Sequence, residues 1–229
     1  MKKILLISCV TIFICSCIFI IQWDQDNKHT KEVLSTLNNG IIPGEKNVII
    51  DFDYLLKQNK DTIGWITVNN TNIDYPIVQT KNNKYYLNHA FDKKYTDAGW
   101  IFMDYRNDFL NDQNTIIYGH DRKDNSMFGT LKNTLKKDWY NDKTNHIITI
   151  YTKDNIYNFQ VFSTYHIKTE DYYVTPNFTK EEYKKFLKTI LKRSTHNYKV
   201  KLDENSKILT LSTCYTKNEK LVLHAVLVF

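Results

Sequence analysis

One cysteine outside the first 17 residues is the side chain most able to do covalent chemistry. Cys214 ends an apolar, β-branched run at residues 207–214, which predicts a strand that stops at a polar segment. Because side chains alternate along a strand, Leu209 and Leu211 are expected on the core face, with Ser212 and Cys214 on the more polar face. A thiol at such a strand end can meet solvent and substrate, as a nucleophile must. The same run also fits a small, buried structural cysteine.

The N-terminal segment indicates where this thiol would work. Residues 4–21 are apolar and uncharged and follow Met1-Lys2-Lys3, and they are long enough to span a bilayer. A cleaved signal peptide is the alternative, but no Ala-x-Ala-like site follows the apolar residues. We therefore expect an uncleaved anchor, with the N-terminus in the cytoplasm and the rest of the chain outside the cell.

Export makes the use of cysteine informative. Cys9, Cys15 and Cys17 all lie within the apolar segment, so Cys214 has no expected disulfide partner. An unpaired thiol outside the cell is a liability unless the protein uses it. This placement favours a nucleophile over a structural cysteine.

A thiol nucleophile needs a base or a cation, because free cysteine titrates near pH 8.5 and is mostly protonated at neutral pH. Histidine is the usual partner. His120 follows the run Ile-Ile-Tyr-Gly at residues 116–119, so it is expected at a strand end where a loop opens. His146 and His166 lie in alternating strands, and His224 lies in an apolar final strand, where structural roles are expected. His120 is therefore the candidate base.

Composition and periodicity indicate a mainly β domain. Aromatic residues make up 14% of the chain, which has only 3 prolines and 6 glycines, and runs rich in Ile, Val and Thr recur. About eight strands with helices inserted between them predict a closed or nearly closed β-barrel. Helices are expected at residues 28–39, 52–59 and 126–140, and from residue 179 onward.

Several short stretches together match a known pattern. They read Tyr-Gly-His at 118–120, Asp-Asn-Ser-Met-Phe at 124–128 and Leu-Thr-Leu-Ser-Thr-Cys at 209–214. These stretches resemble the paired signatures of the sortases, and specifically of class B. Further matches span roughly residues 50–229 in the family's order and lie at 64–66, 73–79, 86–89 and 101–107.

The resemblance implies an eight-stranded sortase-type β-barrel with inserted helices, two N-terminal helices and a membrane anchor, on the outside of a Gram-positive cell. Combined with the apolar N-terminus, it predicts a three-part organisation. The parts are a signal-anchor segment at residues 1–24, a helical region at 25–60 and a catalytic β-barrel at 61–229.

The chemistry implied by the resemblance is transpeptidation by a cysteine enzyme of the thiol protease type. Cys214 would attack the Thr carbonyl of a Thr-Gly-like bond in the C-terminal sorting motif of a surface protein, forming a thioacyl enzyme. His120 would protonate the leaving amine and later deprotonate the incoming one. A peptidoglycan precursor amine would release the product, which anchors the surface protein to the cell wall.

The third family residue is an arginine at the start of the last strand, and this sequence departs from it. The matching position is Lys220, with Lys217 as the nearby alternative. A hairpin would bring Lys220 opposite Cys214. Lysine supplies a charge near a developing oxyanion but lacks the planar, bidentate fork of arginine. Two further residues, Ser212 and Asn88, are candidates for substrate binding and fit a scaffold role equally well.

Other chemistries find little support. The sequence has no Cys-x-x-Cys, His-Glu-x-x-His, phosphate-loop or Gly-x-Ser-x-Gly pattern, so neither a metal nor a cofactor is expected. The formal net charge is +6, and the lysines of residues 180–193 alternate with apolar residues as in an amphipathic helix. A solvated helix face is therefore expected there, and not a nucleic-acid site.

Two alternative functions stay open. A pilin-polymerising sortase is expected to carry a second, C-terminal membrane segment, whereas this sequence ends inside its last expected strand. A catalytically weak, membrane-anchored sortase homologue that only binds peptides is the other alternative, and Lys220 is the residue that motivates it.

Overall fold

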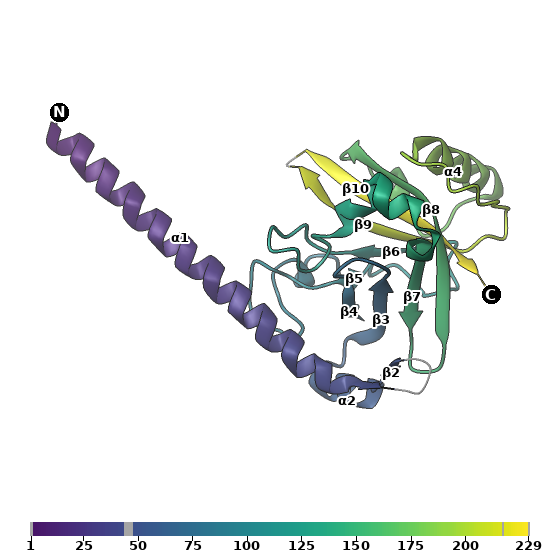
Figure 1. Cartoon of the computed structure of the whole chain (residues 1–229), viewed down its shortest axis with the longest axis horizontal. Coiled ribbons are helices and arrows are strands. Elements are labelled where there is room, and N and C mark those ends of the chain that lie inside the picture. The colour runs from purple at the N-terminus through teal and green to yellow at the C-terminus, as the bar shows by residue number, and fades with distance from the viewer. Residues whose placement is uncertain (1, 44–47, 217, 229) are drawn as a thin grey trace.

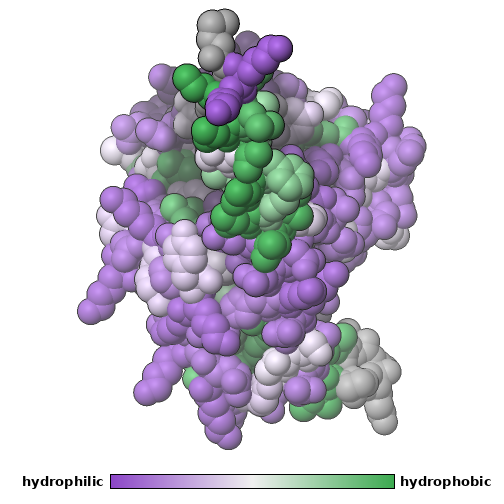
Figure 2. Space-filling model, turned by 90° about the vertical axis from the view of Figure 1, so that its left-hand side faces the viewer, coloured by the Kyte–Doolittle hydropathy of each residue, from purple (hydrophilic) through white to green (hydrophobic). Residues whose placement is uncertain are grey.

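The computed structural model describes residues 2–43, 48–216 and 218–228. Figure 1 shows a long helix, α1, that projects away from a body made mostly of strands. Helix α1 runs over Lys2–Leu37 and is long and apolar enough to cross a membrane. Its large apolar side chains up to Trp23 are exposed, and Figure 2, seen from the side on which α1 projects, shows hydrophobic surface against a mostly hydrophilic body.

Helix α1 extends beyond the predicted anchor at residues 1–24. The sequence predicts a separate short helix at residues 28–39, but the structure continues α1 through this segment to Leu37. Residues 22–37 contain neither glycine nor proline, so nothing in the sequence interrupts the helix. The side chains of Thr30, Val33 and Leu37 are buried against the body. The last two turns of α1 are therefore part of the folded domain.

A short hairpin and a second helix connect α1 to the body. Strands β1 (Ile41–Pro43) and β2 (Val48–Ile50) pair with each other. Helix α2 (Phe52–Gln58) follows, close to the predicted position, and the Asp51 carboxylate accepts a hydrogen bond from the Tyr54 backbone N–H at its start. Helices α1 and α2 are the two N-terminal helices that the family resemblance implies.

Eight strands of the described part of the chain close into a barrel in the order β10-β8-β7-β3-β4-β5-β6-β9. The predicted closed barrel is therefore confirmed. Pairs β6·β9 and β4·β5 are parallel, and the other neighbours are antiparallel. The strands are β3 (Thr62–Val68), β4 (Asp74–Val78), β5 (Phe102–Met103), β6 (Asn114–Tyr118), β7 (Ile147–Tyr151), β8 (Ile156–Lys168), β9 (Ile208–Thr216) and β10 (Glu219–Val228).

Two apolar clusters stabilise the barrel. The larger one fills the interior and includes Leu209 and Leu211 of β9, as the alternation predicts. The smaller one includes Ile208 of β9 and Phe186 of helix α4 (Lys180–Arg193), which packs on the outside of β8. Strand β9 is thus buried on both faces. Its polar side chains lie under a second layer and not in solvent, except at the end of the strand.

The prediction of a single helix at residues 126–140 is wrong. The structure has a 3₁₀ turn at Leu131–Leu135 and the five-residue helix α3 at Lys137–Asn141, separated by an extended Lys136. Met127 has a φ of +52°, which no right-handed helix allows. The apolar periodicity was real, because Met127, Phe128, Leu131 and Trp139 are all buried, but turns and not one helix bury them.

Candidate active site

Cys214 lies where strand β9 leaves the barrel. The six strand residues before it are buried, and Cys214 is the first exposed one. Strand β10 runs back antiparallel beside β9, so Lys220 is paired directly with Cys214. Strand β6 runs parallel to β9 on the other side, with Tyr118 opposite Ser212. Because parallel strands end at the same edge of a sheet, His120, two residues beyond Tyr118, lies at the same edge as Cys214.

A cleft of about 270 Å³ opens at this edge. His120, Cys214, Lys220 and Ser212 all line it, so four of the five sequence-predicted residues come together. Asn88 does not line the cleft, whereas its neighbour Leu87 does. The remaining lining residues are Asn83, Trp100, Phe102, Tyr118, Gly119, Thr169, Glu170, Asp171, Tyr173, Val174 and Thr213.

The side chains of Cys214 and Lys220 are in direct contact. The Lys220 ammonium donates a hydrogen bond to the Cys214 sulfur, with Nζ and Sγ 3.2 Å apart. A cation at this distance favours the thiolate form of a cysteine, which is the nucleophilic form. The alternative cation, Lys217, lies outside the described residues. Lys220 is therefore in place to act on the thiol or on a group bonded to it.

His120 is oriented by the backbone of a distant segment. Its Nε2 lies 2.7 Å from the carbonyl oxygen of Leu87. A carbonyl can only accept a hydrogen bond, so Nε2 carries the proton in this arrangement and Nδ1 is the nitrogen left to exchange one. This bond gives the Leu87 segment a role that its sequence did not reveal, because residues 87 and 120 meet only in the folded chain.

Gly99 leaves the space in which the His120 ring sits. Its φ is +57°, a conformation that favours glycine. A Cβ atom at this position would lie 2.6 Å from the carbonyl oxygen of Tyr86, 2.7 Å from that of Leu87 and 2.9 Å from Cδ2 of His120. All three distances are shorter than van der Waals contact. Gly99 thus lets the Leu87 carbonyl and the imidazole approach each other.

We expect Gly99→Ala to impair catalysis more than folding. The added methyl group must displace the Tyr86 and Leu87 carbonyls or the His120 ring, any of which disturbs the contact between Leu87 and His120, and the φ strain costs about 1–2 kcal/mol of stability. A displacement of the imidazole by about 1 Å can lower turnover on the order of a hundredfold. The measurement is peptide turnover beside the thermal midpoint, with Gly64→Ala as a control that is also crowded, 3.0 Å from the Tyr151 carbonyl oxygen, but does not touch His120. Unchanged turnover in Gly99→Ala would contradict this role.

A buried carboxylate supports the part of the cleft that is lined by Tyr118 and Val174. Asp104 is fully buried and accepts hydrogen bonds from Arg106 Nη2 at 2.7 Å and from the Tyr118 hydroxyl at 2.9 Å. Burial alone would raise the pKa of Asp104, but these bonds hold that pKa below its usual range. Arg106 also donates to the carbonyl oxygen of Val174, which lines the cleft. Asp104 and Arg106 lie in the family match at residues 101–107, whose residue types alone do not indicate this role.

A second buried hydrogen-bond network supports the cleft through Tyr173, another of its lining residues. His224 is fully buried, with Nε2 2.9 Å from the Tyr165 hydroxyl and Nδ1 2.9 Å from the Thr210 hydroxyl. Thr210 in turn donates to Asn114 Oδ1 at 2.6 Å, and the Asn114 amide donates to the carbonyl oxygen of Tyr173 at 3.0 Å. Since Asn114 Oδ1 only accepts, the Thr210 oxygen accepts from Nδ1–H, whereas the Tyr165 hydroxyl can donate either to Nε2 or to the Tyr172 hydroxyl 2.7 Å away. Burial away from water, and not the bonding pattern, favours the neutral form of His224.

Acid should destabilise the fold through this histidine. Burial lowers the pKa of His224 from 6.5 to about 3. Between these two pH values, His224 binds a proton in the unfolded chain but stays neutral in the folded chain. Stability is therefore lost as pH falls through this window, by up to about 5 kcal/mol at roughly 1.4 kcal/mol per unit.

The measurement is the free energy of unfolding of the native protein and of His224→Gln between pH 7 and pH 4. Glutamine keeps one donor and one acceptor but does not titrate, so its stability should fall less steeply with acid. His166→Gln removes an exposed histidine and serves as the control. Parallel curves for the native and His224→Gln proteins would contradict the assignment.

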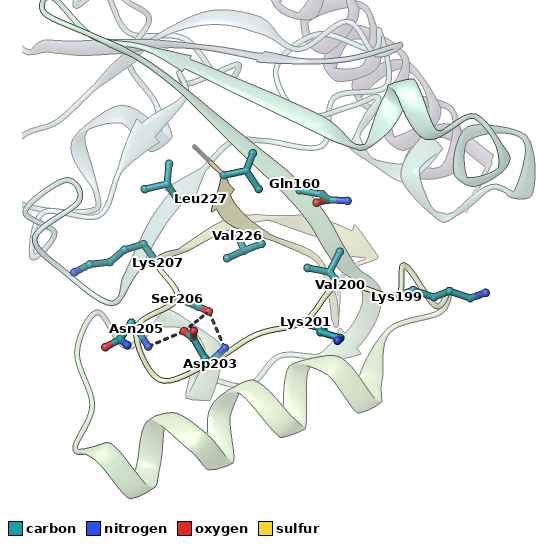
Figure 3. A pocket seen from close by; sticks show the side chains of 11 residues that line it. Gln160, Lys199, Val200, Lys201, Asp203, Asn205, Ser206, Lys207, Val226 and Leu227 are labelled. Atoms are coloured by element: carbon teal, nitrogen blue, oxygen red, sulfur yellow. Dashed lines mark hydrogen bonds between the residues drawn. The ribbon is translucent and has the colours of Figure 1, made fainter.

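A larger cavity, of about 490 Å³, lies at the other end of β10 and has a different character. Figure 3 shows Lys199, Lys201 and Lys207 around it, with Asp203 held by hydrogen bonds to neighbouring loop residues. None of its lining residues is a cysteine or a histidine. Covalent chemistry of the kind inferred from the sequence therefore belongs to the smaller cleft at Cys214.

Comparisons with known proteins agree with this fold and cleft. The family model described as the sortase domain matches residues 66–228. Sortase B of Listeria monocytogenes is 38% identical over 200 residues, which cover 86% of this chain and 77% of the relative. Sortase B of Staphylococcus aureus is 39% identical over 172 residues, which cover 74% of this chain and 70% of the relative.

Solved structures lead to the same family. A Staphylococcus aureus sortase B–substrate complex superimposes with a TM-score of 0.76 at 32% sequence identity, covering 91% of this chain and 98% of the other. A Clostridium perfringens sortase B gives a TM-score of 0.73 at 33% identity, covering 77% of this chain and 99% of the other. With the barrel and cleft described above, these matches show that the chain belongs to the sortase family, as a class B member of these cysteine transpeptidases.

Proposed function

We propose that this sortase cleaves a Thr-Gly-like bond in the C-terminal sorting motif of surface proteins and joins them to a peptidoglycan amine. The observation that carries the proposal is the meeting of Cys214, His120 and Lys220 in one cleft, from the ends of three neighbouring strands. A thiol, an imidazole and a cation are the groups that acyl transfer through a thioester needs. The remaining lining residues offer a groove for the peptide.

The proposed reaction has two acyl-transfer steps. The Cys214 thiol first gives its proton to Nδ1 of His120, which becomes an imidazolium. The resulting thiolate attacks the Thr carbonyl carbon, and the oxygen takes the negative charge beside the Lys220 ammonium. The C–N bond then breaks as His120 gives a proton to the leaving amine, which leaves a thioester on Cys214. The incoming amine loses its proton to His120 and attacks the thioester, the C–S bond breaks, and the thiolate is restored.

Solved relatives support both substrates of this scheme. One Staphylococcus aureus sortase B is described as a substrate complex, and another sortase B is complexed with triglycine, a peptide that carries a primary amine. For this chain we propose Ser212 as a residue that contacts the bound peptide, because it lines the cleft next to Cys214. Asn88, which does not line the cleft, is the weaker candidate and would act on the Leu87 segment.

We also propose the location of the reaction. Helix α1 would stay uncleaved in the cell membrane as a single-pass anchor, with Lys2 and Lys3 on the cytoplasmic side. The barrel would then lie on the outer surface, where peptidoglycan amines and exported surface proteins are both available. The division into an anchor at 1–24, a helical region at 25–60 and a barrel at 61–229 remains a prediction.

The test is turnover by the full chain in detergent micelles. A library of fluorescent peptides with Thr-Gly-like bonds is incubated with the enzyme, with and without triglycine, and products are identified by mass. We expect a thioacyl adduct on Cys214, hydrolysis without triglycine and a ligated product with it. Peptide binding without any adduct would instead favour the peptide-binding homologue, the alternative motivated by Lys220.

A further inference from the structure

The membrane-proximal turns of α1 touch the two segments that hold His120. Arg122, two residues after His120, donates a hydrogen bond from Nη2 to Asn27 Oδ1 of α1. Its side chain is only 10% exposed, and it also forms an ion pair with Asp124 at 3.2 Å. The backbone N–H of Phe128 closes the same loop by donating to the His120 carbonyl oxygen at 3.0 Å. Asn27 therefore contacts a loop that begins at the candidate base.

The second segment is the one that follows Leu87, whose carbonyl binds the imidazole. His29 of α1 lies 2.9 Å from Asp92, measured from Nε2 to Oδ2. Asp26 accepts a hydrogen bond from the Asp97 backbone N–H at 3.3 Å. Residue 97 is two positions before Gly99, which packs against Leu87 and His120. One face of α1 is thus tied to both loops at once.

We propose that residues 26–30 of α1 are a positioning element for His120, so that the helix which enters the membrane also sets the geometry of the active site. The proposal rests on the function proposed above for His120. Asn27 lies six residues beyond Ile21, the last apolar residue of the predicted anchor, or roughly 9 Å along the helix axis at about 1.5 Å per residue. The contact is therefore made directly outside the expected bilayer edge.

The neighbouring turns of α1 show that these polar contacts are not needed to attach the helix. Val33 and Leu37 are buried in the main core, and Thr30 is also buried. Apolar burial at these positions stabilises the docking of the helix by itself. The Asn27 contact reaches the His120 loop, so its loss should change catalysis more than stability.

The experiment compares the full chain in detergent with Asn27→Ala, Asn27→Asp and the control Gln25→Ala, which changes an exposed residue of the same helix. We measure single-turnover acylation at saturating peptide, peptide affinity and the thermal midpoint. Asn27→Ala should slow acylation on the order of tenfold with unchanged peptide affinity. Asn27→Asp keeps an acceptor for Arg122 and should restore the rate, while Gln25→Ala should equal the native protein.

A second readout does not depend on turnover. Amide hydrogen exchange of residues 88–97 and 120–126 should be faster in Asn27→Ala than in the native protein or in Gln25→Ala. Faster exchange in Asn27→Ala, together with a native protein that never acylates, would support the positioning contact and overturn the proposed function instead. Unchanged exchange and acylation in Asn27→Ala would overturn the proposal, as would an Asn27→Asp variant as slow as Asn27→Ala.

Discussion

Replacing Cys214 by alanine is expected to abolish peptide turnover and to leave the fold intact. Without the sulfur no thioester can form, and loss of a catalytic nucleophile lowers turnover on the order of 10⁶-fold in well-studied acyl transferases. Cys214 is exposed, so its removal should change the free energy of unfolding by only about 0.5 kcal/mol. The effect should therefore appear in chemistry alone.

Mass spectrometry and thermal unfolding check this expectation together. Cys214→Ala should show no acyl adduct with any peptide that labels the native chain, and its thermal midpoint should match. Cys9→Ala and Cys15→Ala change thiols in the exposed apolar part of α1 and serve as matched controls with full activity. Turnover by Cys214→Ala at the native rate would remove this residue from the mechanism.

Local patterns predicted the elements that carry the candidate site. The strand expected before His120 is β6 (Asn114–Tyr118), and the strand predicted at residues 207–214 is β9, which runs over Ile208–Thr216. The helix predicted from residue 179 begins there because Thr179 and Glu182 form a capping box. Lys220 lies opposite Cys214, as the hairpin argument predicted, but a register shift between Glu219 and Lys220 produces this pairing, since Glu219 pairs with Thr216.

The contacts that orient His120 could not be predicted in this way. Leu87 and Gly99 lie far from His120 in the sequence, and the interaction uses a backbone carbonyl, which leaves no signature in side-chain type. The contact of Asn27 with Arg122 is equally non-local. The helix expected at residues 126–140 failed for a related reason, since tertiary burial of the same apolar residues overrode helical periodicity.

Replacing Lys220 by alanine is the second change expected to have a large effect. If its ammonium stabilises the oxyanion, Lys220→Ala should slow acylation by about a hundredfold, equivalent to about 3 kcal/mol, with little change in peptide affinity. The native contact complicates this expectation, because Nζ already binds the Cys214 sulfur at 3.2 Å. Only stabilisation that is greater in the transition state than in the ground state accelerates the reaction.

Charge moves from sulfur to oxygen as the thiolate attacks, so the ammonium must follow it to contribute. The Lys220 backbone is paired on one side with Cys214 and on the other with Ile167, which fixes its Cα while leaving a flexible four-carbon stem. Such a stem lets the ammonium group move from the Cys214 sulfur toward the substrate oxygen. Lys220→Arg should therefore retain or raise activity, since a guanidinium offers two parallel donors and can contact sulfur and oxygen together.

Two rates separate the roles of Lys220. Alkylation by iodoacetamide reports the reactivity of the Cys214 thiolate, and single-turnover acylation reports attack on the peptide. A cation that acts only on the thiolate would change both rates equally in Lys220→Ala, whereas an oxyanion donor would slow acylation far more than alkylation. Lys201→Ala, an exposed lysine at the opposite end of the barrel, is the control. Equal acylation in the native, Ala and Arg forms would exclude Lys220 and direct attention to Lys217 or to backbone amides near Tyr215.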